Sequence, residues 1–200
     1  MQRIRLGLSL GMLLAVVPAA AQSSAPTNVT PQVEVALGYT YMRARSVVPG
    51  GCCFNMNGGS ASVAVGINRW LSFAGEFGGY YTGNVQGSGN SLLVLPFIFG
   101  PRFTYRRNDR VTPFAQGLFG GGHAGGTLYT QAFQPGPAPP SARTAFAMAV
   151  GGGLDVNVTQ RWAIRAFQAD WFFTEFPNGA SDHEHNFRLT TGVVMRFGSR

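Results

Sequence analysis

The sequence predicts an all-β protein, an eight-stranded antiparallel up-and-down transmembrane β-barrel. Eight stretches between Val33 and Phe197 alternate large apolar residues with small or polar ones. Short and long connections alternate between them along the chain. Only 12% of the residues are charged. A period of two produces strands with two unlike faces. Alternating short turns and long loops are typical of small outer-membrane barrels.

Six of the stretches fit the alternation without adjustment. In the last of them Phe187, Leu189 and Val193 share one face, whereas Arg188, Thr190 and Arg196 share the other. One face is therefore bulky and apolar, and the other is small with a few charges. The six stretches are Val33–Tyr41, Ala61–Asn68, Leu71–Gly78, Leu93–Thr104, Phe146–Asp155 and Asn186–Phe197.

Two stretches fit less well. The fifth, from Val111 to about Ala124, contains Pro113 and residues 120–122, which are all glycine, so its register is ambiguous. In the seventh, the phase set by Arg165 would turn the polar residues at 168 and 170 toward lipid. A β-bulge near residues 166–167 would return them to the interior, which is favoured because a polar side chain against lipid is costly.

The N-terminus has the pattern of a secretory signal. Arg3 and Arg5 accompany an apolar run that ends at residues 18–21, Pro-Ala-Ala-Ala. The alternative is a membrane anchor, but the run is shorter than a span requires, so residues 1–21 are predicted to be a signal peptide. Residues 22–32 are then a short periplasmic lead-in, and residues 33–200 the barrel domain.

The composition of the two faces decides which one meets lipid. A soluble barrel such as a lipocalin turns its apolar face inward and needs a charged exterior, which this chain lacks. Aromatic residues also gather near both ends of the strands, as expected at two membrane interfaces. One group is Tyr39, Tyr41, Tyr81, Trp171 and Phe172, and the other is Trp70, Phe103, Tyr105, Trp162 and Phe197.

The connections predict an orientation. Short turns at 68–69, 107–109 and 159–160 are expected in the periplasm. Long loops at 43–59, 82–90, 125–143 and 175–184 are expected outside the cell, where they are the natural contact surfaces.

Three segments resemble a known family. Residues 99–105 (FGPRFTY), 113–115 (PFA) and 194–198 (VMRFG) resemble outer-membrane β-barrel proteins related to the transmembrane domain of outer membrane protein A. The resemblance covers nearly all of the chain after residue 21. It implies localisation in the bacterial outer membrane. The aromatic last strand resembles the signal that such proteins present to the barrel-assembly machinery, an expected partner during insertion.

The predicted inner face carries four acidic residues and four arginines. Buried charges must pair, and the guanidinium fork binds carboxylates, so we expect a salt-bridge network that plugs the barrel. An alternative is a gate whose pairs exchange partners to pass small ions. The eight residues are Glu34, Glu76, Arg102, Asp155, Arg165, Asp170, Arg188 and Arg196.

The predicted loops and the strand ends beside them contain three further groups of reactive side chains. Cys52 and Cys53 could form a vicinal disulfide or pair between chains. Residues 182–185 (DHEH) are a hydrated loop or a weak metal site. His123 with Thr127, or His185 with Asp182, could be proposed for hydrolysis at the rim, but nothing places a nucleophile beside its base. The glycine runs at 117–122 and 151–153 lack the context of phosphate loops. We therefore predict no enzyme activity, no metal and no cofactor.

The net charge is +7, and all of the positively charged side chains counted in it are arginines, because the chain has no lysine. The arginines are scattered, which argues against nucleic-acid binding and favours contact with outer-membrane lipids. We expect a monomer with a structural or surface-interaction role, such as envelope integrity or adhesion, and with a surface partner that the sequence does not identify. The alternatives are a narrow channel for ions or small solutes and a rim hydrolase.

Overall fold

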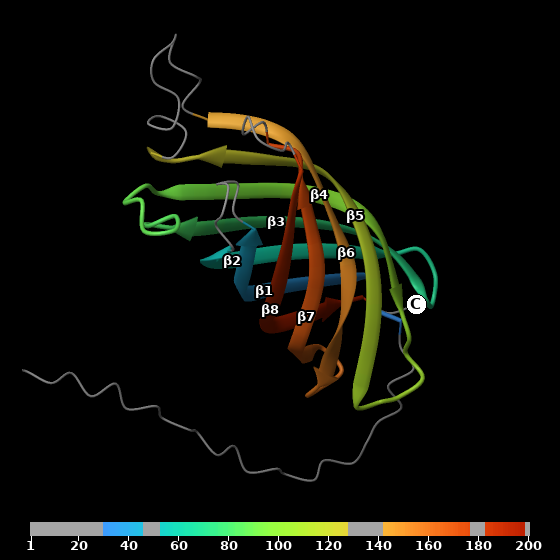
Figure 1. Ribbon diagram of the computed structural model, residues 1–200. Coiled ribbons are helices and arrows are strands. Elements are labelled where there is room, and N and C mark those ends of the chain that lie inside the picture. Colours follow the sequence, from blue (N-terminus) through green and yellow to red (C-terminus); the bar gives the residue numbers. More distant parts are fainter. Residues whose placement is uncertain (1–29, 46–52, 128–141, 177–182, 199–200) are drawn as a thin grey trace, which may run out of the picture.

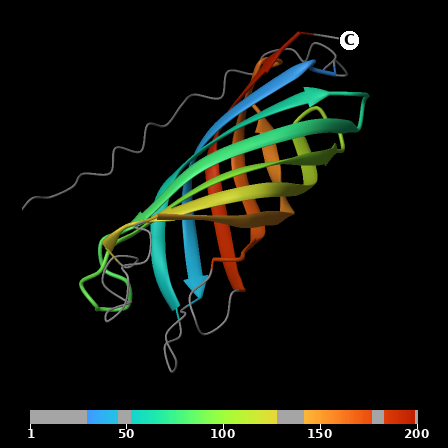
Figure 2. The ribbon, with the colours of Figure 1, turned by 90° about the horizontal axis from the view of Figure 1, so that it is seen from above.

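The protein is an eight-stranded antiparallel β-barrel, closed by pairing of the first strand with the last (Figures 1 and 2). The computed structural model describes residues 30–45, 53–127, 142–176 and 183–198. The predicted signal peptide and most of the predicted lead-in lie outside these residues. Every strand pairs with its sequence neighbours, so the predicted fold class is confirmed. The strands are β1 Val33–Arg45, β2 Cys53–Gly66, β3 Leu71–Thr82, β4 Leu92–Thr104, β5 Val111–Gly125, β6 Ala142–Asn157, β7 Trp162–Thr174 and β8 Glu184–Phe197.

The barrel has two unlike ends. The turn end carries the short β2–β3, β4–β5 and β6–β7 connections, and the loop end carries the β1–β2, β3–β4, β5–β6 and β7–β8 connections. In Figure 1 the turn end lies at the right and bottom of the barrel. Within the described part of the chain, no helix is long and apolar enough to cross a bilayer.

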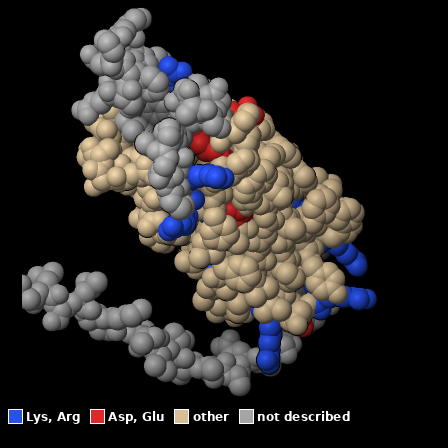
Figure 3. Space-filling model, in the orientation of Figure 1, with Lys and Arg blue, Asp and Glu red and all other residues tan. Residues whose placement is uncertain are grey.

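The outer wall is apolar along the middle of the strands. Leu37, Val63, Phe77 and Phe97 point outward and are well exposed, whereas the residues between them are buried or small. Figure 3 shows a largely uncharged wall between the two ends. A wall of this kind is suited to lipid, as the period of two predicted.

Strand β5 is continuous despite its proline and glycines. Pro113 precedes the point at which β5 first pairs with β4, through Phe114 and Thr104, so its missing N–H is tolerated. Gly120 and Gly121 lie opposite β4, where an added Cβ would overlap the backbone or ring of Phe97. The glycines thus permit close strand packing and do not interrupt pairing.

The bulge expected in β7 is present. Its pairing with β8 shifts register between Arg165 and Gln168, and its pairing with β6 shifts at the same level. Ala166 and Phe167 are consequently both exposed on the outer wall. Arg165, Gln168 and Asp170 all face the interior, where they are buried.

The strands extend farther at the loop end than the sequence predicted. The first loop was expected at 43–59, but β1 continues to Arg45 and β2 begins at Cys53, not at Ala61. In this extension the faces exchange character, because Met42 and Met56 point inward and are buried whereas Asn55 and Asn57 are exposed. The prediction ended the strand where the outward residues became polar, although the chain remains extended beyond the apolar wall.

One aromatic assignment was wrong. Phe172 was placed in the outer belt beside Trp171, but it points into the barrel and is fully buried. Adjacent residues of a strand face opposite sides, so only Trp171 belongs to the outer wall. Tyr39, Tyr81, Trp70, Trp162 and Phe197 are exposed on that wall.

Candidate functional site

The candidate site is the interior of the barrel. The structure places all eight predicted interior charges inside it, each at most 8% exposed. Three oppositely charged pairs are direct cross-strand partners: Glu34 with Arg196, Asp155 with Arg165, and Asp170 with Arg188. These ion pairs depend on the strand register, because a slip of one residue would turn every side chain of a strand to the other face.

Arg188 is the centre of the network. Its guanidinium lies 2.5 Å from Glu76 Oε1 and 2.7 Å from Asp170 Oδ2, and it donates a 2.8 Å hydrogen bond to Tyr80 Oη. Gln168 donates to both carboxylates through Nε2, at 3.1 Å and 2.8 Å. Glu76 and Tyr80 come from β3, whereas the other three residues come from β7 and β8. These bonds therefore connect opposite walls across the lumen.

A second level lies nearer the turn end. Arg165 binds both oxygens of Asp155, at 2.9 Å and 3.2 Å, and donates to the side-chain oxygen of Gln168 at 2.7 Å. Arg102 donates two hydrogen bonds to Gln116 Oε1, at 2.9 Å and 2.7 Å. The guanidinium carbons of Arg102 and Arg165 lie 4.9 Å and 4.5 Å from the ring centre of Phe114. Cation–π contacts of this kind stabilise closely spaced arginines.

The third level lies at the mouth of the turn end. Glu34 Oε1 accepts from Arg196 Nε and Glu34 Oε2 accepts from Arg106 Nη2, both at 2.8 Å. Arg196 Nη1 also donates to Asn157 Oδ1 at 2.7 Å. The carboxylate of Glu34 thus forms ion pairs with two arginines. One of them, Arg106, was absent from the predicted network.

The loop half of the interior is mainly apolar, although Thr174 and Asn186 are also buried there. The prediction of a lumen filled by small residues and isolated charges was incomplete here, because large side chains pack on the loop side of Arg188. Tyr80 and Phe172 meet edge to face, with ring centres 6.4 Å apart, and the guanidinium of Arg188 lies 5.3 Å from the ring centre of Phe172. The other large, fully buried apolar side chains are Met42, Met56, Ile98 and Leu118.

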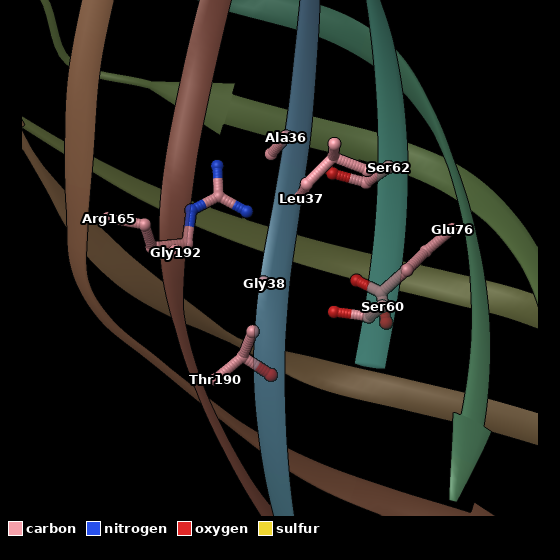
Figure 4. Close-up of a pocket in the computed structure, with 9 residues that line it drawn as sticks. All are labelled: Ala36, Leu37, Gly38, Ser60, Ser62, Glu76, Arg165, Thr190 and Gly192. Atoms are coloured by element: carbon pink, nitrogen blue, oxygen red, sulfur yellow. The ribbon is translucent and has the colours of Figure 1, made fainter. Parts of the chain in front are cut away.

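The cavity that lies beside the network is small. A cavity of about 10 Å³, enough for one water molecule, lies beside β1 between Glu76 and Arg165 (Figure 4). Figure 4 shows these two side chains approaching it from opposite sides, with Ser60, Ser62 and Thr190 around them. Thr40 bridges Thr190 and Ser60 at 2.8 Å and 3.1 Å.

Sequence reasoning missed several partners of the predicted charges. Gln116 was missed because the glycine run left the register of β5 open, although its spacing from Phe114 and Leu118 marks the inner face. Tyr80 continues the inward phase of Glu76, but a large aromatic residue was not expected inside. Arg106 lies beyond the end of β4, and no periodicity applies there.

The other predicted groups lie at the loop end. Cys53 forms a disulfide, and the one other cysteine, Cys52, lies outside the described residues. Of the 182–185 group, Asp182 lies outside them too, and His185 stacks on Trp171 with ring centres 5.3 Å apart. Among the described residues no three His, Cys, Asp or Glu side chains form a metal-binding group.

Of the two histidines considered for hydrolysis, His123 has a different partner from the one expected. His123 Nδ1 lies 2.9 Å from Thr144 Oγ1, on the outer wall. Thr127, the residue first considered beside it, exchanges hydrogen bonds with Ser91.

Comparison with known proteins agrees with this architecture. Residues 8–197 match the family model described as "Outer membrane protein beta-barrel domain". A search of curated protein sequences finds no match. The family match covers almost the whole chain.

Three solved structures illustrate the fold. Neisserial surface protein A is 15% identical, with a TM-score of 0.64 over 83% of this chain and 97% of its own. Ail, the attachment invasion locus protein of Yersinia pestis, is 19% identical, with a TM-score of 0.54 over 84% and 99%. The N-terminal β-barrel domain of Pseudomonas aeruginosa OprF is 11% identical, with a TM-score of 0.51 over 84% and 98%. Together with the family match and the apolar wall, these similarities show that the chain belongs to the outer-membrane protein β-barrel family and is a protein of the bacterial outer membrane.

Proposed function

We propose that this protein is a sealed membrane barrel that presents its loop end for surface interactions such as adhesion. The filled interior carries the proposal. Ions or solutes crossing the lumen would have to separate the Arg188 ion pairs and then pass the apolar layer of Phe172, Ile98 and Leu118. Both steps are costly, because separating a buried pair leaves uncompensated charge and an apolar constriction excludes water.

The extension of β1 and β2 supports the second half of the proposal. Beyond the apolar wall these strands have polar outer faces and an apolar interior, as a water-soluble barrel does. Tyr41 donates to Asn55 Oδ1 at 2.8 Å and Arg43 donates to the same oxygen at 3.4 Å, so an ordered polar surface stands above the wall. Tyr39 and Asn57 form a similar pair at 2.7 Å. One structural neighbour, Ail, is by its name an attachment protein.

Conductance tests the sealed lumen. Protein refolded into planar bilayers should give no reproducible single-channel steps, and Glu76→Gln should behave in the same way. Regular steps in the unmodified protein that change with Glu76→Gln would instead identify a narrow channel with Glu76 in its gate.

Adherence tests the surface role. The protein would be displayed in a non-adherent bacterial host, and attachment to cultured cells and extracellular matrix would be counted. The double variant Arg43→Ser/Arg45→Ser should reduce attachment, because it removes two exposed charges from the loop end. The control Arg107→Ser/Arg110→Ser removes the same charge from the turn end and should have no effect. Absence of attachment, or equal losses in both variants, would contradict the proposal.

A further inference from the structure

The two halves of the lumen carry unequal charge. At the level of Arg188, one guanidinium faces the two carboxylates of Glu76 and Asp170. Toward the turn end, four guanidiniums share only two carboxylates, those of Glu34 and Asp155. The arginines in this half are Arg102, Arg106, Arg165 and Arg196. Arg102 bonds to an amide and, among the described residues, to no carboxylate.

This positive excess borders a cavity at the mouth of the turn end. The cavity has a volume of about 30 Å³, the space of two or three water molecules. Its lining residues are Arg106, Asn108, Thr112, Asn157, Thr159, Gln160 and Arg196. No acidic side chain is among them. Figure 3 shows further basic side chains projecting from this end of the barrel, at the lower right.

Several hydrogen-bond donors in this lining are unused. Arg196 is 8% exposed, and its Nη2 is buried without a hydrogen-bond partner among the described residues. Asn108 accepts the backbone N–H groups of Arg110 and Val111 through its oxygen, which leaves its amide hydrogens. Thr159 accepts two backbone N–H groups in the same way, which leaves its hydroxyl hydrogen.

We propose that this mouth is a binding site for a phosphate-class oxyanion. Arg106 and Arg196 supply the charge, since both already bind one anionic group, the carboxylate of Glu34, from two sides. Phosphate offers more acceptor oxygens than a carboxylate, which suits a lining with guanidinium, amide and hydroxyl donors. The bound anion would neutralise part of the excess that Glu34 and Asp155 leave uncompensated.

Isothermal titration of the refolded protein in a non-ionic detergent, at constant ionic strength, tests the site. Inorganic phosphate should bind with one saturable stoichiometric site, and chloride should not compete. Arg106→Gln should weaken binding by about tenfold or more, the effect of losing one charge-assisted hydrogen bond. Arg106 is the suitable target because Arg196 remains to pair with Glu34. Arg107→Gln, which removes the same charge from an exposed position outside the lining, should change binding less than about twofold.

A second variant tests the site without altering the ion pair between Arg106 and Glu34. Gln160 is exposed and lines the cavity, so Gln160→Glu should repel the anion while leaving the barrel intact. Folding of each variant is checked by heat-modifiable gel migration. Glycerophosphoglycerol, a soluble phosphodiester, is titrated in parallel. Tighter binding of the diester would identify a lipid head group as the source, and tighter binding of inorganic phosphate would identify a free phosphate or monoester. Absence of saturation, or equal losses for Arg106→Gln and Arg107→Gln, would overturn the proposal.

Discussion

Replacing Arg188 with methionine should destabilise the barrel more than any other single change in the lumen. Methionine keeps much of the side-chain length but removes the guanidinium. The change leaves Glu76 and Asp170, which are 2% and 1% exposed, without their shared cation, and Tyr80 without its donor. Removing one partner of a buried ion pair costs about 3–5 kcal/mol, because the remaining charge is uncompensated. Because two carboxylates lose their cation, the expected loss in unfolding free energy lies in the upper part of that range.

A triple variant separates charge from packing. Arg188→Met/Glu76→Gln/Asp170→Asn removes the cation together with both anions and nearly preserves volume. If the single change is costly because it leaves unpaired charge, the triple variant should regain most of the lost unfolding free energy. Its stability should then lie within about 2 kcal/mol of that of the unmodified protein. Arg107→Met, at an exposed turn position, serves as the control and should change stability by less than about 0.5 kcal/mol.

Urea unfolding in phospholipid vesicles measures these differences. Trp70, Trp162 and Trp171 all lie on the outer wall, so their fluorescence should change as the barrel leaves the lipid. A loss of less than about 1 kcal/mol for Arg188→Met would refute the reasoning, because it would show that the pairs contribute little net energy. A triple variant no more stable than the single one would also refute it, since the loss would then arise from packing.

Two further predictions use the same assay. Arg102→Met should cost about 1–3 kcal/mol, less than Arg188→Met, because it leaves the side-chain oxygen of Gln116 without its donor but strips no carboxylate of its partner. An equal or larger loss would contradict this. Gly100→Ala should cost about 1–3 kcal/mol, because its Cβ would overlap the carbonyl of Gly117 on β5. Gly117→Ala should be tolerated, since the nearest side-chain atom, in Phe119, is 3.9 Å away; similar losses in both glycine variants would show that close β4–β5 packing is not the cause.

The alternation of the sequence was sufficient to predict the barrel because one rule operates along most of each strand. Leu37 and Val63 meet lipid and Glu34 and Ser62 do not, and a period of two records that difference residue by residue. The bulge in β7 was predictable for the same reason, since Asp170 would otherwise have faced lipid. Thus the sequence patterns predicted both the fold and the direction of the interior charges.

The partners of these charges were less predictable. Cross-strand contacts such as Asp155 with Arg165 follow from register, but Arg188 reaches Glu76 across the lumen, which depends on the closure of the barrel. Gln168 was predicted to face inward, but its bonds to two carboxylates depend on that same closure. Arg106 leaves the end of a strand, where no alternating pattern predicts its direction.

The exchange of faces at the loop end explains both the error in the first loop and the division of the lumen. Where strands leave the bilayer, water replaces lipid outside, so polar residues such as Asn55 and Asn57 turn outward and Met42 and Met56 turn inward. The resulting apolar layer covers the Arg188 network on its loop side and limits access of water to it from the loop end. Ion pairs are stronger when water is excluded, so this layer strengthens the network as well as closing the lumen. At the turn end, Arg106 and Arg196 instead line the cavity at the mouth of the barrel.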